Sequence, residues 1–170
     1  GQYANPMVVR IAGLAYQKGF GGHFHNDNSI AVFRDIPGVI LACPSHGADA
    51  VMMMREAFRL AREEKRVVIF LEPIALYGAK DLVESGDGLM TAVFDDVQDG
   101  ARFGDVGVFG GDDADLAIIT YGNGTYLSRR AARTLEERGL KARIIDLRWL
   151  IPLPVESMLT ALGDTKNVLV

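Results

Sequence analysis

VILACPSHGADAVMMMREAFRLAREEKRVVIFLEP, residues 39–73, is the clearest structural pattern in this chain. Residues 39–42 and 67–71 are apolar without alternation, which is typical of strands buried on both faces of a sheet. Between them apolar residues recur at helical spacing, and we expect a helix with Ser45 as its N-cap and its end near Arg62. A strand, a helix and a strand in this order predict a parallel pair with a right-handed crossover.

The same alternation extends outward from this stretch in both directions. Upstream, PMVVRI (6–11) predicts a strand, residues 13–22 a glycine-rich loop, and residues 29–35 a short helix capped by Asn28 or Ser29. Downstream, strands are expected at 116–121, 142–147 and 167–170, and helices at 125–138 and 154–162. The pattern predicts an α/β protein with parallel sheets.

An acidic, glycine-rich stretch divides the chain. Residues 78–113 hold nine Asp or Glu against two Lys or Arg, and eight glycines. We interpret them as a solvated connector that adds little to the core, with an edge strand at residues 106–109. The flanks, residues 1–77 and 114–170, each offer about three strands, whereas a doubly wound domain usually needs about five or six. The chain is therefore expected to be a fragment that holds two incomplete domains.

Composition excludes several classes of protein. No apolar run approaches the ~18 residues of a membrane span. Basic residues do not cluster with aromatic ones, so nucleic-acid binding has no support. A single cysteine, Cys43, forms no internal disulfide, which fits a reducing, intracellular compartment and a role as a small buried hydrophobe.

GGHFHNDN, residues 21–28, is the first candidate site. Imidazole suits proton transfer near neutral pH, so a histidine in such a loop is an acid/base candidate. The alternative is a surface turn in which the Asn and Asp side chains make turn hydrogen bonds. A second alternative is a metal site, because His23, His25 and Asp27 share one face of an extended segment.

Gly122-Asn123-Gly124 follows a predicted strand, and Asp146 ends the next one. This is the layout of a dinucleotide-binding unit with an acid placed for a ribose, but Leu127 stands where a third glycine is expected. An ordinary turn between strand and helix is favoured. Other conspicuous residues have simple interpretations: the three methionines 52–54 as core filler, His46 as a surface or cap residue, and Trp149 as interface or core.

Several strings occur in an order that resembles one family. They are PMVVRI (6–11), a glycine-rich loop that ends in His25, IPGVILACPS (36–45), VIFLEPIALY (68–77), DLAIITYG (115–122) and IDLRWLIPLP (145–154). Together they resemble the beta subunit of the thiamine-diphosphate-dependent 2-oxo acid dehydrogenases of the pyruvate and branched-chain type. The resemblance covers essentially the whole chain.

The resemblance implies that residues 1–77 are the latter part of a pyrimidine-binding domain and that residues 114–170 begin a transketolase-type C-terminal domain. It implies oxidative decarboxylation of a 2-oxo acid and acyl transfer to a lipoyl group, with thiamine diphosphate and magnesium as cofactors. Implied partners are an alpha subunit or alpha-like half, a lipoyl-bearing acyltransferase and a second beta subunit, in the cytoplasm or the mitochondrial matrix. The family's cofactor-binding groups are expected outside this chain, which is therefore expected to be inactive alone.

The family also implies one catalytic residue. It places an active-site histidine twelve residues before the proline of a Pro-Gly turn, and His25 lies twelve before Pro37. The resemblance thus implies that His25 acts during acyl transfer, with His23 and Asp27 as groups that adjust its pKa.

Departures from the family leave the substrate open. Asn26 and Asp27 replace the usual Ser and Gln, and Asp35 replaces a common second histidine. Glu64 and Arg66 replace an Asp-x-Asn pair that binds potassium in some members, so no metal site is expected. Transketolase and deoxyxylulose-phosphate synthase are alternatives, although their Gly-Pro-Thr-His string is absent. A subunit-docking domain without chemistry and a dinucleotide-binding domain also stay open.

Overall fold

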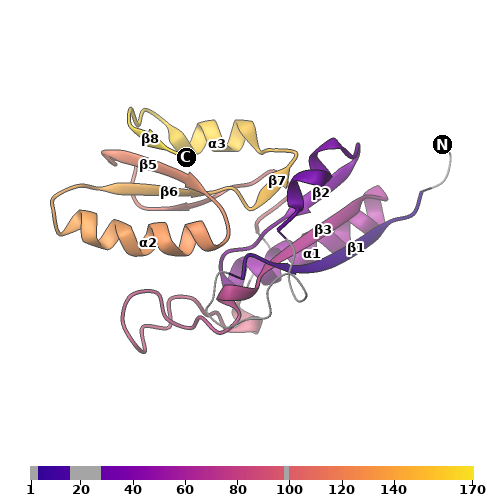
Figure 1. Ribbon diagram of the computed structural model, residues 1–170, viewed down its shortest axis with the longest axis horizontal. Coiled ribbons are helices and arrows are strands. Elements are labelled where there is room, and N and C mark those ends of the chain that lie inside the picture. Colours follow the sequence, from indigo (N-terminus) through magenta and orange to yellow (C-terminus); the bar gives the residue numbers. More distant parts are fainter. Residues whose placement is uncertain (1–3, 16–27, 98–99) are drawn as a thin grey trace.

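The computed structural model describes residues 4–15, 28–97 and 100–170 (Figure 1). In chain order the elements are β1 (Met7–Gly13), the 3-10 helix η2 (Ile30–Asp35), β2 (Val39–Ala42), α1 (Gly47–Glu64), β3 (Val67–Pro73), the 3-10 turns η3 (Ile74–Leu76) and η4 (Phe94–Asp96), β4 (Gly107–Phe109), β5 (Leu116–Thr120), α2 (Asn123–Glu136), β6 (Ala142–Asp146), β7 (Trp149–Ile151), α3 (Val155–Leu162) and β8 (Val168–Leu169). They form a first sheet of order β1-β3-β2-β7 and a second sheet of order β4-β6-β5-β8. The predicted α/β fold with two sheets is confirmed.

The first sheet is covered on both faces, and successive side chains of its strands point alternately to one face and the other. β1, β3 and β2 pair in parallel. Ile40, Ala42 and Phe70 belong to the core that includes α1, whereas Leu41 and Cys43 belong to a core on the other face. Burial on both faces explains why these strands read as unbroken apolar runs.

Helix α1 begins one residue after His46, whose Nδ1 accepts the Ala48 backbone N–H at 3.1 Å. The prediction that Ser45 is the N-cap is wrong, because the Ser45 hydroxyl donates to Asp146 instead. Met53 is fully buried against the sheet and the two methionines beside it pack at the edge of this core, which confirms their role as core filler. The helix ends at Lys65, which takes the left-handed conformation.

The second sheet is built around the parallel pair β5 and β6. Strand β4 lies at its edge and pairs antiparallel with β6, so the predicted edge strand is confirmed. The sheets are mostly parallel, as predicted, but β4 and β7 are both antiparallel to their neighbours, which makes both sheets mixed. Both strands have only three residues.

Strand β7 joins the two halves of the molecule (Figure 1). The chain leaves the second sheet after β6, and β7 then pairs antiparallel with β2 of the first sheet. Trp149 is fully buried there and stands edge-on to Phe103, with ring centroids 5.4 Å apart. Ala101 also packs in this core. Residues 78–113 therefore contribute more to the core than their composition predicts.

No helix in the described part of the chain is long and apolar enough to cross a membrane.

Candidate functional site

The glycine-rich loop with His23, His25 and Asp27 lies outside the described residues, so the roles of these three side chains stay predictions. The residues on either side of it are described. The Leu14 backbone N–H donates to Asn28 Oδ1 at 2.8 Å, and Asn123 Nδ2 donates to the Leu14 carbonyl at 2.7 Å. Leu14 and Asn28 therefore lie together at the carboxyl edge of the first sheet, beside the first residue of α2.

Close packing at this edge explains the glycines of the Gly-Asn-Gly motif. A Cβ at Gly122 would lie 3.0 Å from Leu14 Cδ1 and 3.1 Å from Cys43 Sγ, and Gly122 has a φ of +52°. A Cβ at Gly124 would lie 2.0 Å from Thr120 Oγ1. Both glycines are required by protein contacts, which favours the ordinary turn over a phosphate-binding loop.

Asp146 lies in the junction between the two sheets and is fully buried. Its Oδ2 accepts the Ser45 hydroxyl, so this carboxylate is not available to a ribose, and the dinucleotide alternative loses its acidic residue. Burial raises the pKa of Asp146 to about 6, the Ser45 hydrogen bond opposes the rise, and the neighbouring Asp49 adds to it. Asp49 in turn pairs with Arg148, with Oδ1 and Nη2 2.7 Å apart.

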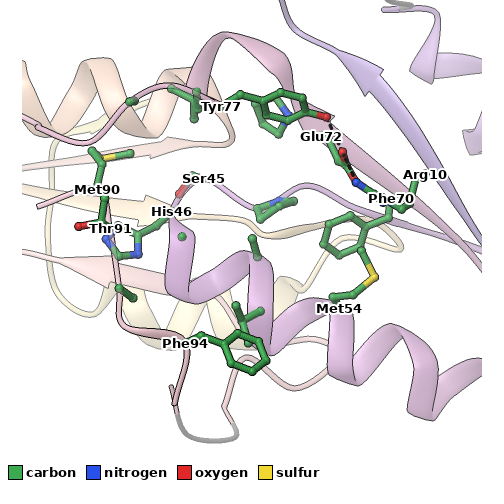
Figure 2. Close-up of a pocket in the computed structure, with 18 of the residues that line it drawn as sticks. Arg10, Ser45, His46, Met54, Phe70, Glu72, Tyr77, Met90, Thr91 and Phe94 are labelled. Atoms are coloured by element: carbon green, nitrogen blue, oxygen red, sulfur yellow. Dashed lines mark hydrogen bonds and ion pairs between the residues drawn. The ribbon is translucent and has the colours of Figure 1, made fainter. Parts of the chain in front are cut away.

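A cavity of about 810 Å³ lies on the α1 face of the first sheet (Figure 2). Its walls come from α1, from β3 and from the segment that runs through η3 to η4. The apolar residues among them are Ala50, Val51, Met54, Phe58, Phe70, Leu76, Met90, Ala92 and Phe94. The cavity is therefore mainly apolar and aromatic, and its size is that of a small-molecule site.

A polar triad stands at one side of the cavity, where Figure 2 shows Glu72 between Arg10 and Tyr77. Glu72 accepts hydrogen bonds from Arg10 Nε, from Arg10 Nη2 at 3.0 Å and from the Tyr77 hydroxyl. Burial raises the pKa of Glu72, but the bonds from Arg10 and Tyr77 outweigh it and hold that pKa below its ordinary value. Burial and the Glu72 carboxylate raise the pKa of Tyr77 to about 12.

The triad and the cavity were not predicted from the sequence. The available signal was charge within apolar strands: Arg10 lies in β1 and Glu72 in the neighbouring β3. The parallel register pairs Arg10 with Phe70, so Glu72 stands two residues further along on the same face.

Neither of the two carboxylates, Glu72 and Asp146, is free for the aminopyrimidine of a thiamine cofactor. Glu72 is hydrogen-bonded to Arg10 and Tyr77, and Asp146 is fully buried with its Oδ2 bonded to Ser45. Within residues 4–15, 28–97 and 100–170, no three His, Cys, Asp or Glu side chains are grouped so that they could hold a metal ion.

Comparisons with known proteins give a consistent picture. The chain is 29% identical to the beta subunit of acetoin:2,6-dichlorophenolindophenol oxidoreductase of Cupriavidus necator, over 100% of the chain and 45% of that protein. It is 31% identical to the 2-oxoisovalerate dehydrogenase subunit beta of Bacillus subtilis, over 96% of the chain and 45% of the relative. The pyruvate dehydrogenase E1 component subunit beta of the same organism is 26% identical, over 100% of the chain and 47% of the relative. The chain thus spans about half the length of these relatives.

Solved structures agree on the fold. A split-gene transketolase, described as an inactive beta4 tetramer, matches 95% of this chain and 45% of its own, with a TM-score of 0.62 and 21% identity. Residues 108–170 match the transketolase C-terminal domain family. These residues belong to that domain family, and the chain as a whole is a homologue of the beta subunits of pyruvate, 2-oxoisovalerate and acetoin dehydrogenases.

Proposed function

We propose that this chain is part of the decarboxylating component of a 2-oxo acid dehydrogenase, in which His25 is a catalytic residue. The observation that carries the proposal is the alignment of the entire chain with beta subunits named for three related substrates. In this proposal residues 1–77 are the latter part of a pyrimidine-binding domain, and residues 114–170 are the start of the C-terminal domain. Residues 78–113 connect the two. The partners are an alpha subunit or alpha-like half, a second beta subunit and a lipoyl-bearing acyltransferase.

Thiamine diphosphate with magnesium supplies the bond-breaking chemistry when it is bound to the complete enzyme. In this proposal the contribution of this chain is proton transfer by His25, a reaction for which an imidazole is well suited near neutral pH. Asp27 favours the protonated form of a neighbouring imidazole, and His23 opposes it when it is itself charged. Asn28 and Asn123 bond to the backbone of Leu14, which lies just before this loop in the chain.

The test compares His25→Ala and His23→Ala in the complete enzyme with its alpha subunit. Acylation of a lipoyl domain, assayed with pyruvate, 2-oxoisovalerate and acetoin as alternative substrates, should fall ~10²–10⁴-fold for His25→Ala, the usual effect of losing a positioned acid or base. His23→Ala should cost much less. Equal losses, mimicked by a chelator, would favour the metal-site alternative. Activity only with sugar phosphates would favour a transketolase-like or deoxyxylulose-phosphate synthase-like enzyme.

The 170-residue chain alone should release no carbon dioxide from pyruvate or 2-oxoisovalerate above a cofactor-only control. The reason is that the chain covers only 45–47% of the length of its relatives, and that the proposed alpha subunit is absent from this assay. Measured turnover by the purified chain would contradict this part of the proposal.

A further inference from the structure

The cavity lies on the α1 face of the first sheet. Arg10, Phe70 and Glu72 line the cavity, whereas Leu14 and Cys43 belong to the core on the opposite face of that sheet. All residues that line the cavity are described, and the role proposed for His25 uses none of them.

The loop of residues 81–89, which joins the lining residues Lys80 and Met90, is held by many internal hydrogen bonds. Asp87 accepts four backbone N–H groups at 2.7–2.9 Å, those of Leu82, Val83, Glu84 and Leu89. Asp81 accepts two more, and Leu82 and Met90 are buried beneath the loop. His46 Nε2 also lies 2.9 Å from the Leu89 carbonyl. A loop held this closely needs little ordering when a ligand enters, which favours binding.

The mouth of the cavity exposes aromatic surface to solvent. Phe58, Tyr77 and Phe94 are each more than 60% exposed, although all three line the cavity. Large apolar side chains that gather at a concave surface mark binding sites. Because the rings are aromatic, a flat or branched apolar body fits them well.

Charge defines the other part of the ligand. The cavity is lined by the cations Arg10, Arg55 and Lys80 but by one carboxylate, Glu72. Arg10 and Tyr77 already satisfy Glu72. Lys80 is exposed, and its ammonium group makes no ion pair with a described residue. The lining thus holds more cationic than anionic side chains, and Lys80 is the cation that a ligand can reach.

We propose that this cavity binds a small amphipathic anion, with an aromatic or branched apolar body and a single carboxylate or sulfonate group. The body lies among Met54, Phe58 and Phe94, and the anionic group lies against Lys80 and the outward N–H groups of Arg10. Neutral molecules with the same body bind more weakly, because they leave this positive charge without a counter-ion.

Two fluorescent probes test the proposal on the full chain. Anilinonaphthalene sulfonate carries the aromatic body and the anion, and phenylnaphthylamine carries the same body without the charge. The sulfonate should bind more tightly. Lys80→Met should weaken the sulfonate about threefold to fivefold, the range of an exposed ion pair, and leave the neutral probe unchanged. Lys166→Met, at an exposed lysine of the second sheet's half, is the matched control and should change neither.

Two further variants make the outcome decisive. Met54→Trp should fill the cavity and reduce binding of both probes. Arg10→Met combined with Glu72→Gln should weaken the sulfonate alone, without leaving a buried carboxylate unpaired. The proposal is overturned if the chain binds neither probe, if Met54→Trp leaves both unaffected, or if the charge variants weaken both probes equally.

Discussion

Asp146 brings an ionisable carboxyl group into the buried junction between the two sheets. Burial raises its pKa to about 6, whereas an aspartate in an unfolded chain has a pKa of ~3.9. The folded state therefore holds this proton more tightly than the unfolded state does. Below about pH 4 the stabilisation from protonation is complete, and it is lost as the pH rises through the folded pKa.

Asp146→Asn should consequently raise the free energy of unfolding at pH 7.5, by on the order of 3 kcal/mol at most. Asn is neutral at every pH and keeps an oxygen for the Ser45 hydroxyl. Urea unfolding at pH 7.5 and pH 5 measures the effect, and the advantage of the variant should be smaller at pH 5. Asp164→Asn, at an exposed aspartate, is the control. An advantage of equal size at both pH values would show that titration of Asp146 is not its cause.

At the scale of secondary-structure elements, the N-terminus of helix α1 depends on the imidazole ring of His46. His46 Nδ1 accepts the Ala48 N–H, so the ring proton must lie on Nε2, which donates to the Leu89 carbonyl at 2.9 Å. One neutral ring thus caps the helix and tethers the cavity wall. The two functions are separable by substitution.

His46→Ala should lower the free energy of unfolding by ~1 kcal/mol, the usual effect of losing an N-cap. His46→Asn should recover most of this loss, because Asn is among the best N-caps. Both variants lose the tether to Leu89, so limited proteolysis of residues 80–91 should accelerate in both. Chemical denaturation and proteolysis together separate the cap from the tether. An alanine variant as stable as the asparagine variant would show that the N-cap hydrogen bond of His46 does not stabilise the helix.

Elements with long local patterns were predictable from the sequence. Helix α1 and strand β3 follow from helical spacing and from an unbroken apolar run, and both were predicted within about two residues. Strand β7 was missed because it has three residues before Pro152, and its pairing with β2 lies more than a hundred residues away in the chain. Ser45 was assigned as a cap because a hydroxyl before a helix usually is one, but a tertiary bond to Asp146 takes precedence.

The same distinction applies to the candidate sites. His25 was selected through the resemblance to the family, because the glycine-rich loop by itself left a surface turn and a metal site open, and no described contact tests the selection. The triad of Arg10, Glu72 and Tyr77 forms only through the register of β1 on β3, and the cavity needs the folded segment after β3 as its wall. Arg10 and Glu72 are 62 residues apart in the chain, so no local pattern connects them.

At the scale of the whole molecule, the two sheets should unfold together. Strand β7 adds to the first sheet, the Cys43 N–H donates to the Arg148 carbonyl at 2.7 Å, and Arg148 pairs with the buried Asp49. Trp149, the single tryptophan, lies in this junction, so its fluorescence reports the junction while far-UV circular dichroism reports all helices and strands. The two signals should change at the same urea concentration, as expected for a cooperative transition.

Removing Arg148 is the sharpest test of this coupling. Arg148→Met leaves the Asp49 carboxylate buried without its partner and should lower the free energy of unfolding by ~3 kcal/mol or more. Adding Asp49→Asn should recover part of the loss, because no unpaired charge then stays buried. The tryptophan transition of the single variant should move to lower urea, with any separation from the circular dichroism transition reduced in the double variant. Arg138→Met, at an exposed arginine of the same half, should change neither signal. If Arg148→Met behaves like Arg138→Met, the ion pair does not join the two sheets, and the contacts of Trp149 must do so alone.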